Sequence, residues 1–481
     1  MTKHPIMGFG LLKNIEVFEN RGVAKINNRL LLNSSYTVST LPISIEKDVY
    51  GNTFIATGGG IGIGTVYKNG ASIQTSLSNI WDMKIWKDYL WIRHGTVMSA
   101  YGPLSQGVNA QWFPNVVTAM TDLYYGKLLV GQDDFLYTIH GNYVAKFVYS
   151  TGGTVGVAPT LTPTLTALDL KDGLYATTLV EFGTKIMVGV GGGINFSDAS
   201  NFKEARIYPW NRQAGTLGNP GLADLPIIFN ENGLWQMISK VNRLFIVAGT
   251  SGNVYESDGT NYRKIATLPF IQSGIYANAE YFPNAIEISD KGTLLIGVSV
   301  GSDGYSKAGV YEIDIDDPAY PVCLKNVIST GNMTSTTGRI SIGVVKPINN
   351  QTMLVGWRDG STFGVDSSDY IMYASYGGVI ETDMVKVGTY NNKHTFSQLE
   401  WGLSEPLVNG QKIRISFRKN NKEDYSTPQE WTYGGFTEGL LSFADTFAIA
   451  DAEYVQLKIE LDQATTTIYG SNLNLLYVKI W

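Results

Sequence analysis

The residue types that carry most enzyme chemistry are sparse in this chain of 481 residues. Its four histidines, His4, His94, His140 and His394, lack the spacing of a metal-binding or catalytic motif. HExxH is absent, and we expect no nucleophile elbow between a strand and a helix. A Ser/His/Asp triad built from distant segments stays open at this stage. Because lone histidines are more often structural, we predict no catalytic residues, no cofactor and no metal ligands.

Acidic residues offer the alternative of a glycosidase, in which two carboxylates flank one sugar bond. Five of them lie near the starts of apolar segments: Asp82, Asp122, Asp134, Glu181 and Glu312. The sequence does not say which of them converge, and the Ser-x-Asp-x-Gly-x-x-Trp box of sialidases is not reproduced. We therefore favour a protein that is not an enzyme over the glycosidase alternative.

Glycine-rich and acid-rich runs could suggest other ligands. The runs at 58–64 and 188–194 match neither GxGxxG nor GxxxxGK[ST] before a helix, so we interpret them as turns and reject nucleotide binding. The acidic runs at 132–134 and 314–317 lack the twelve-residue calcium loop with its terminal Glu. Solvated turn carboxylates are the better interpretation of both acidic runs.

The composition argues against several classes of partner. The net charge is −6, and no basic stripe of the kind that nucleic-acid binding needs is visible. No apolar run approaches the roughly 18–20 residues of a membrane span, and the first residues lack the apolar core of a signal peptide. We expect no nucleic acid partner, no membrane span and no secretion. A single cysteine, Cys323, excludes an internal disulfide framework.

A repeated apolar pair indicates the architecture that would position these residues. Each pair opens an apolar strand followed by Gly, Asn or Asp turns, and the pairs lie 36 to 59 residues apart: Phe54-Ile55, Leu90-Trp91, Leu128-Leu129, Ile186-Met187, Leu244-Phe245, Leu294-Leu295 and Met353-Leu354. Repeats of about 40–50 residues are typical of β-propeller blades. We predict an all-β fold with a propeller of about seven blades, with six or eight as alternatives. The pairs should form the inner strands, and the tyrosines after them should pack between sheets.

The two ends of the chain differ from the repeats. Residues 1–45 contain alternating segments that would either close the ring as a last strand or reach a neighbouring subunit as an arm. Residues 46–384 hold the blades. In residues 385–481, apolar residues alternate cleanly at 413/415/417, 455/457/459/461 and 476/478/480, which predicts half-buried antiparallel strands. We interpret 385–481 as a C-terminal β-sandwich.

Aromatic residues are abundant, with ten Trp in the chain. A Trp in a propeller usually packs between blades, but Trp210 lies in a polar, turn-rich insertion with Arg212 and Gln213. Exposed Trp residues anchor protein interfaces and stack on sugars. We therefore predict that Trp210, Arg212 and Gln213 form an interaction patch.

Residues 205–269, together with NIEVFENRG near the start and LLYVKIW at the end, resemble virion proteins of tailed bacteriophages. This resemblance implies a propeller core, a closing sandwich and a tail or vertex component assembled in the host cytoplasm, with no catalytic residues to carry over. The expected partners are other virion proteins, in a homo-oligomeric ring within the particle. The alternative is a carbohydrate-binding receptor module that contacts a host surface glycan through aromatics of the sandwich or the blade loops.

Overall fold

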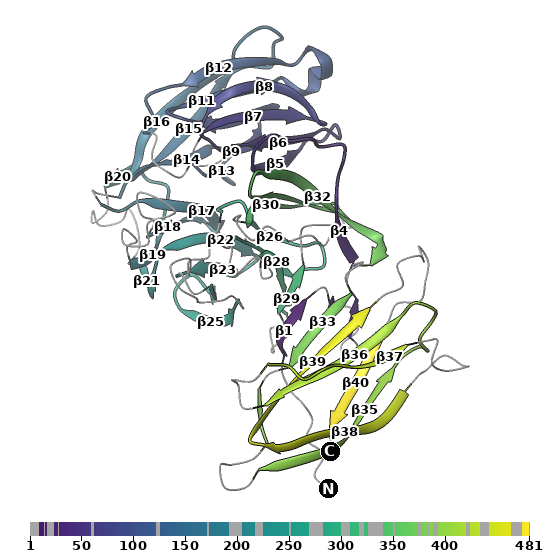
Figure 1. Cartoon of the computed structure of the whole chain (residues 1–481). Coiled ribbons are helices and arrows are strands. Elements are labelled where there is room, and N and C mark those ends of the chain that lie inside the picture. The colour runs from purple at the N-terminus through teal and green to yellow at the C-terminus, as the bar shows by residue number, and fades with distance from the viewer. Residues whose placement is uncertain are drawn as a thin grey trace. The chain divides into compact units, whose positions relative to one another are not determined.

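The computed structural model shows an all-β protein (Figure 1). It describes residues 9–13, 15–16, 24–26, 28–58, 62–121, 126–170, 173–191, 204–216, 225–249, 252–268, 282–299, 308–316, 322–325, 340–349, 352–373, 377–382, 384–387, 393–419, 424–432, 442–462 and 474–480. Within these ranges the one helical element is the 3-10 turn η1, Leu104–Asn109. The chain divides into two compact units, one formed by Leu32–Val310 with Asn332–Ser367, the other by Met1–Leu31, Tyr311–Gly331 and Ser368–Trp481.

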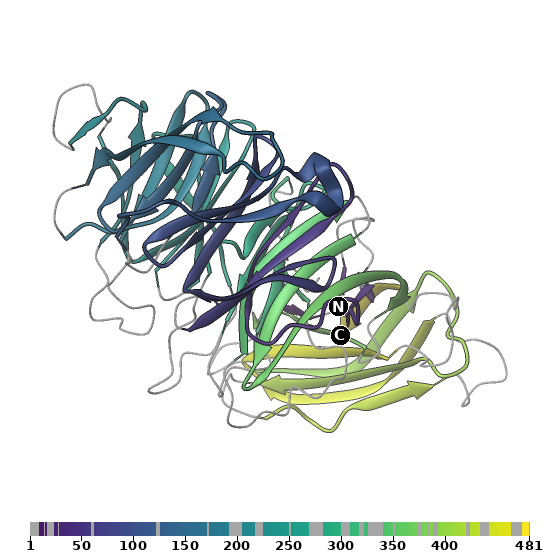
Figure 2. The same ribbon diagram turned by 90° about the horizontal axis from the view of Figure 1, so that it is seen from above.

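The first unit is a series of antiparallel sheets that follow one another along the chain (Figures 1 and 2). The first two groups of strands are β5 (Pro42–Lys47), β6 (Thr53–Thr57), β7 (Ile63–Lys68) and β8 (Ala71–Ser78), and then β9 (Ile80–Trp86), β10 (Tyr89–His94), β11 (Val97–Gly102) and β12 (Gln111–Val117). The next two are β13 (Leu128–Val130), β14 (Leu136–His140), β15 (Tyr143–Thr151) and β16 (Thr160–Asp169), with β20 (Gly215–Thr216) at its edge, and then β17 (Ala176–Phe182), β18 (Lys185–Val190), β19 (Glu204–Trp210) and β21 (Ile227–Asn232). The last three are β22 (Leu234–Lys240), β23 (Arg243–Ala248), β24 (Asn253–Ser257) and β25 (Tyr262–Thr267); β26 (Ile286–Ile288), β27 (Leu294–Val298) and β28 (Gly309–Ile313); and β30 (Ile340–Asn349), β31 (Thr352–Asp359) and β32 (Thr362–Tyr373).

The sheets form a closed ring, which is the arrangement of a β-propeller. The first strand of each sheet contacts the first strand of the next, in the order β5, β9, β13, β17, β22, β26 and β30, and β30 contacts β5. Figure 1 shows these first strands nearest the common centre of the unit. The fourth strand of the β30–β32 sheet is β4 (Asn28–Leu32), which comes from the beginning of the chain. Next to it, the Asn33 backbone N–H donates to the carbonyl of Val365 at 2.9 Å.

The repeated apolar pairs lie mostly on the second strand of each sheet, so the prediction that they form the inner strands is wrong for six of the seven. Only Leu128-Leu129 lies on an innermost strand, β13. The reason is how many faces of each strand are covered by neighbouring sheets. A second strand such as β10 is buried along its whole length, because neighbouring sheets cover both of its faces, whereas an innermost strand turns one face to the polar centre. The tyrosines that follow the pairs, Tyr67, Tyr137, Tyr255 and Tyr311, are buried as expected.

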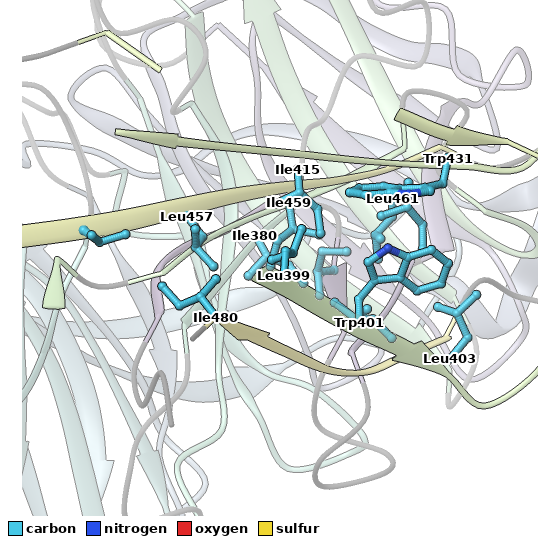
Figure 3. Packing of buried hydrophobic residues seen from close by; sticks show 14 of the residues in the cluster. Ile380, Leu399, Trp401, Leu403, Ile415, Trp431, Leu457, Ile459, Leu461 and Ile480 are labelled. Carbon is cyan, nitrogen blue, oxygen red and sulfur yellow. The ribbon is translucent and has the colours of Figure 1, made fainter. Parts of the chain in front are cut away.

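The second unit consists of two sheets that share one hydrophobic core (Figure 3). One sheet has the order β29 (Val322–Lys325), β1 (Phe9–Lys13), β33 (Gly378–Thr382), β39 (Tyr454–Asp462), β36 (Lys412–Lys419) and β37 (Gln429–Thr432), with β34 (Val385–Lys386) also paired to β39. The other has the order β2 (Ile15–Glu16), β3 (Ala24–Ile26), β40 (Asn474–Ile480), β35 (His394–Leu403) and β38 (Ser442–Ala452). In Figure 3 the side chains of Trp401 and Ile480 from the second sheet lie beside Leu457 and Trp431 from the first.

The alternation read from the sequence matches this core in two strands and departs from it in a third. Ile413 and Ile415 of β36 are buried, as are the alternating apolar residues of β39, and Phe417 of β36 is half-buried against the same core. In β40, Ile480 is buried as expected and Val478 is half-buried against the same core, but Leu475 is buried and Leu476 is 42% exposed, which corrects the expected face of Leu476 alone. The pairing of β35 with β40 shifts register between Gly402 and Leu403. Such an irregularity exchanges the two faces of a strand beyond it.

The observed division of the chain differs from the expected boundaries at 45 and 384. Described strands from before residue 32 pair with strands from after residue 377, since β1 pairs with β33 and β3 pairs with β40. The parallel pair β1–β29 adds a segment from the middle of the chain. The second unit is therefore assembled from three separate segments, because its two sheets need those strands to complete their hydrogen bonding.

Candidate functional site at the centre of the ring

The innermost strands place polar side chains toward the middle of the ring. In β5, Ser44 and Glu46 alternate with the buried Ile43 and Ile45. Because alternate residues of a strand point to opposite faces, Ser44 and Glu46 share one face. The strand β9 repeats this pattern, and its polar residues contact those of β5: the Ser44 hydroxyl donates to Asp82 Oδ1 at 2.8 Å, and Lys84 forms an ion pair with Glu46.

Asn284 joins strands on opposite sides of the ring. Its amide Nδ2 donates to Asp82 Oδ1 at 2.8 Å and to the carbonyl of Ile43 at 3.0 Å, and its Oδ1 accepts a hydrogen bond from Lys127 Nζ. Lys127 directly precedes β13 and Asn284 lies just before β26, and these two strands are not neighbours in the ring. Contacts that cross the ring in this way place Asn284 at its centre.

Asp82 is held as a hydrogen-bond acceptor. Its side chain is almost completely buried. Oδ1 also accepts the backbone N–H of Met83 at 2.8 Å, and Oδ2 accepts that of Leu128 at 2.9 Å. A buried carboxylate is stable when several donors satisfy its oxygens. Asp82 therefore ties together three segments that are far apart in the sequence.

The charged groups around Asp82 compensate one another. Burial alone would raise the pKa of Glu46, but Lys84 and Lys346 outweigh it, so this pKa is lowered. Burial would likewise lower the pKa of Lys84, but Glu46 and Asp82 raise it above its ordinary value. Lys346 Nζ lies 3.5 Å from Glu287 Oε2. The Lys84–Glu46 pair therefore stays ionised at neutral pH.

Lys127 differs from the other two lysines at the centre. Its ammonium donates to uncharged oxygens, Asn284 Oδ1 and the carbonyl of Pro283 at 3.4 Å. Burial lowers the pKa of Lys127, and Asp82 counteracts that shift only in part. The three lysines and the carboxylates Glu46, Asp82 and Glu287 thus form one network, the central cluster, whose formal charges cancel.

The acidic residues proposed for a glycosidase do not converge. Asp82 is in the central cluster, but Asp134 lies on an exposed turn, where Lys87 Nζ and Trp86 Nε1 donate to it. Glu181 forms an ion pair with Arg212, and Glu312 is buried in β28. Asp122 lies outside the described residues. The printed partners of Asp134 and Glu181 thus differ from those of Asp82.

Of the proposed patch of Trp210, Arg212 and Gln213, only Gln213 is exposed. Trp210 is fully buried, packs edge-on against Tyr137 with ring centroids 5.8 Å apart, and donates from Nε1 to the carbonyl of Gln213 at 2.8 Å. The Arg212 side chain is 14% exposed and pairs with Glu181. The polar sequence around Trp210 misled the prediction. Trp210 is the last residue of β19, and its indole faces a neighbouring sheet.

Other reactive side chains have structural partners. His94 Nε2 lies 2.8 Å from Ser99 Oγ, and His140 Nε2 lies 2.6 Å from the carbonyl of Leu165; burial lowers the pKa of His140. Cys323 is fully buried. The expectation of no nucleophile elbow overlooked a GxSxG sequence at 297–301, but Ser299 is buried and its Oγ accepts the backbone N–H of Ile342 at 2.9 Å.

The described residues contain neither a candidate metal site nor a candidate membrane-spanning helix. No group of three or more His, Cys, Asp or Glu side chains there could hold a metal ion. The same part of the chain has no helix with the length and apolar character needed to cross a membrane.

Comparisons with known proteins give a distant similarity of fold. No family model and no curated protein match the sequence. Among solved structures, the extracellular domain of a one-component system from B. thetaiotaomicron is 12% identical with a TM-score of 0.46, over 88% of this chain and 48% of that one. The Swd1 β-propeller domain from Myceliophthora thermophila is 8% identical with a TM-score of 0.44, over 71% of this chain and all of that domain. This chain spans about half the length of the B. thetaiotaomicron domain. At these values the matches carry no conclusion about activity or ligand.

Proposed function

We propose that this chain is a non-enzymatic structural protein of a tailed-phage virion, built as a seven-bladed β-propeller with a C-terminal β-sandwich. It would act as a rigid tail or vertex component that docks on neighbouring virion proteins. The virion assignment rests on the sequence resemblance described above, and the rigid-scaffold role rests on the central cluster.

The observation that favours a scaffold is the hub formed by Asn284. In propeller enzymes of the glycosidase type, axial carboxylates must be open to substrate. Here the axial carboxylate Asp82 instead accepts hydrogen bonds from Ser44, Asn284 and two backbone N–H groups. Cross-links of this kind hold the innermost strands in fixed positions, which suits a component that transmits load between partners.

The partners that follow from this proposal are other virion proteins. Virion components usually obey closed symmetry, so we propose a homo-oligomeric ring in the particle, assembled in the host cytoplasm. The β-sandwich would supply one contact surface and the outer edges of the blades another.

Quantitative mass spectrometry of purified virus particles tests the proposal. The expected result is a few to a few tens of copies of this chain per particle, scaled to the major capsid protein. Absence from particles that infect normally would overturn the virion role. Crosslinking within intact particles would then identify the neighbours on which the chain docks.

A further inference from the structure

A hollow lined by residues with polar groups lies at one end of the sheet β22–β25, and it shares no lining residue with the central cluster. It has a volume of about 250 Å³ and is open to solvent. The turn between β22 and β23 and the turn between β24 and β25 meet there, and the lining residues are Asn242, Arg243, Glu256, Ser257, Asp258, Asn261, Tyr262 and Arg263. All of these carry polar groups, and one also presents an aromatic ring.

The aromatic ring is supported from behind. Tyr262 lies on β25, the edge strand of its sheet (Figure 1), and its side chain is 39% exposed. Its ring packs against Phe229 with centroids 4.3 Å apart, and Tyr255 lies edge-on to it at 5.6 Å. A ring held in this way loses little conformational entropy when a ligand stacks on it.

The charged groups of the hollow are fixed and alternate in sign. Glu256 accepts hydrogen bonds from Arg243 Nε and from both Nε and Nη2 of Arg263. Burial would raise the pKa of Glu256, but the two arginines outweigh it and keep the carboxylate ionised. The Arg243 guanidinium also lies over the Phe245 ring, 5.0 Å from its centroid. The arginines are thereby oriented before any ligand arrives.

Asp258 supplies a second ordered acceptor at the rim. Its Oδ1 accepts the backbone N–H groups of Thr260 at 2.8 Å and Asn261 at 2.7 Å, and these bonds lower the pKa of Asp258. A carboxylate has about four acceptor sites. The exposed Asp258 can therefore accept hydroxyl donors from a ligand while its turn stays intact.

This combination suits one ligand chemistry. A sugar hydroxyl donates one hydrogen bond and accepts others, so a pair of neighbouring hydroxyls matches adjacent carboxylate and guanidinium groups. The apolar face of a pyranose ring stacks on an aromatic ring. Two arginines and two carboxylates cancel in formal charge, so the hollow offers no excess attraction to a phosphate or a polyanion. We propose that the hollow formed by Arg243, Glu256, Asp258 and Tyr262 binds a neutral hexose unit of a surface glycan.

The test uses the purified full-length chain on an array of oligosaccharides of glucose, galactose and mannose, with their uronate and sulfate counterparts. Calorimetric titration with the neutral oligosaccharide that binds then compares variants. Tyr262→Ala removes the stacking ring and should weaken binding at least tenfold. Tyr50→Ala is the matched control, because Tyr50 is also an exposed tyrosine, on the turn between β5 and β6, and it should bind as the unaltered chain does.

A second variant distinguishes a direct loss of binding from a loss of folding in β25. Asn242→Ala changes an exposed side chain of the lining without touching the Tyr262 contacts, and it should weaken binding several-fold with an unchanged unfolding midpoint. Three results would overturn the proposal: no neutral glycan binds, only the charged counterparts bind, or Tyr262→Ala binds like Tyr50→Ala. The virion role is measured separately by particle composition, so either can fail while the other holds.

Discussion

Replacing Asp366 by asparagine should flatten the pH dependence of this protein's stability between pH 5 and pH 8. Asp366 lies on β32 and is fully buried. Trp357 Nε1 donates to Oδ1 at 2.7 Å, whereas Oδ2 has no hydrogen-bond partner within the described part of the chain. Burial raises the pKa of Asp366 to about 8, against the opposing hydrogen bond from Trp357.

The sign of the effect follows from that shift. A carboxyl whose pKa is higher in the folded protein than in the unfolded chain binds its proton more tightly when folded. Its contribution to the free energy of unfolding is complete below about pH 4, falls as the pH rises from there to about 8, and is lost above that pH. The slope approaches about 1.4 kcal/mol per pH unit, so the free energy of unfolding should drop by about 4 kcal/mol between pH 5 and 8.

Asparagine keeps the shape of the side chain and stays neutral at every pH in that range. Its Oδ1 can still accept from Trp357, while an unpaired amide N–H costs about 1–3 kcal/mol. Asp366→Asn should therefore be slightly less stable than the unaltered protein at pH 5 and more stable at pH 8. Denaturant unfolding at pH 5, 6, 7 and 8 measures this difference.

Asp134→Asn provides the matched control. Asp134 is exposed, has a left-handed backbone with φ of 61° that asparagine also adopts, and has a pKa lowered by Lys87 and Trp86. It is ionised in folded and unfolded chains throughout this pH range, so the control should show the same fall in stability as the unaltered protein. If Asp366→Asn shows that fall too, the reasoning about Asp366 is refuted.

Three further tests, with four substitutions, probe the packing. Asn284→Ala deletes the hub of the central cluster and leaves Asp82 and Lys127 underpaired, so it should cost about 2–4 kcal/mol in denaturant unfolding; a loss below 1 kcal/mol would contradict the hub. Trp210→Ala should lower the free energy of unfolding by about 3–5 kcal/mol, and unchanged stability would contradict the burial of Trp210. Leu475→Asp should unfold the second unit in a thermal melt, while Leu476→Asp should stay within about 0.5 kcal/mol; equal effects would refute the register shift in β40.

Local patterns predicted those parts of the fold that depend on neighbouring residues. The alternation in β36 and β39 marked their buried faces because a strand has a period of two, and the tyrosines expected to be buried after four of the apolar pairs are buried. The same rule applied to Asp82 and Lys84, which alternate with apolar residues in β9, would have indicated the polar face at the ring centre.

Contacts across the ring were beyond such reasoning. Asn284 has no distinctive sequence around it, and its importance comes from closure of the ring, which brings it to Asp82 and Lys127. The error at Trp210 has a related cause, because a polar flanking sequence says nothing about which sheet covers a side chain. The exchange of Leu475 for Leu476 arises from a register irregularity that no single strand reveals.

The pairing of β3 with β40 has a consequence for synthesis on the ribosome. Ala24 pairs with Leu475, so strands made first must wait for strands made last before their sheet is complete. During translation the early strands have unpaired edges, and such edges favour aggregation or association with another chain. The β4 strand must likewise wait for β32 before it completes its sheet. We expect productive folding to be largely post-translational and to be the step at which chaperones protect this chain.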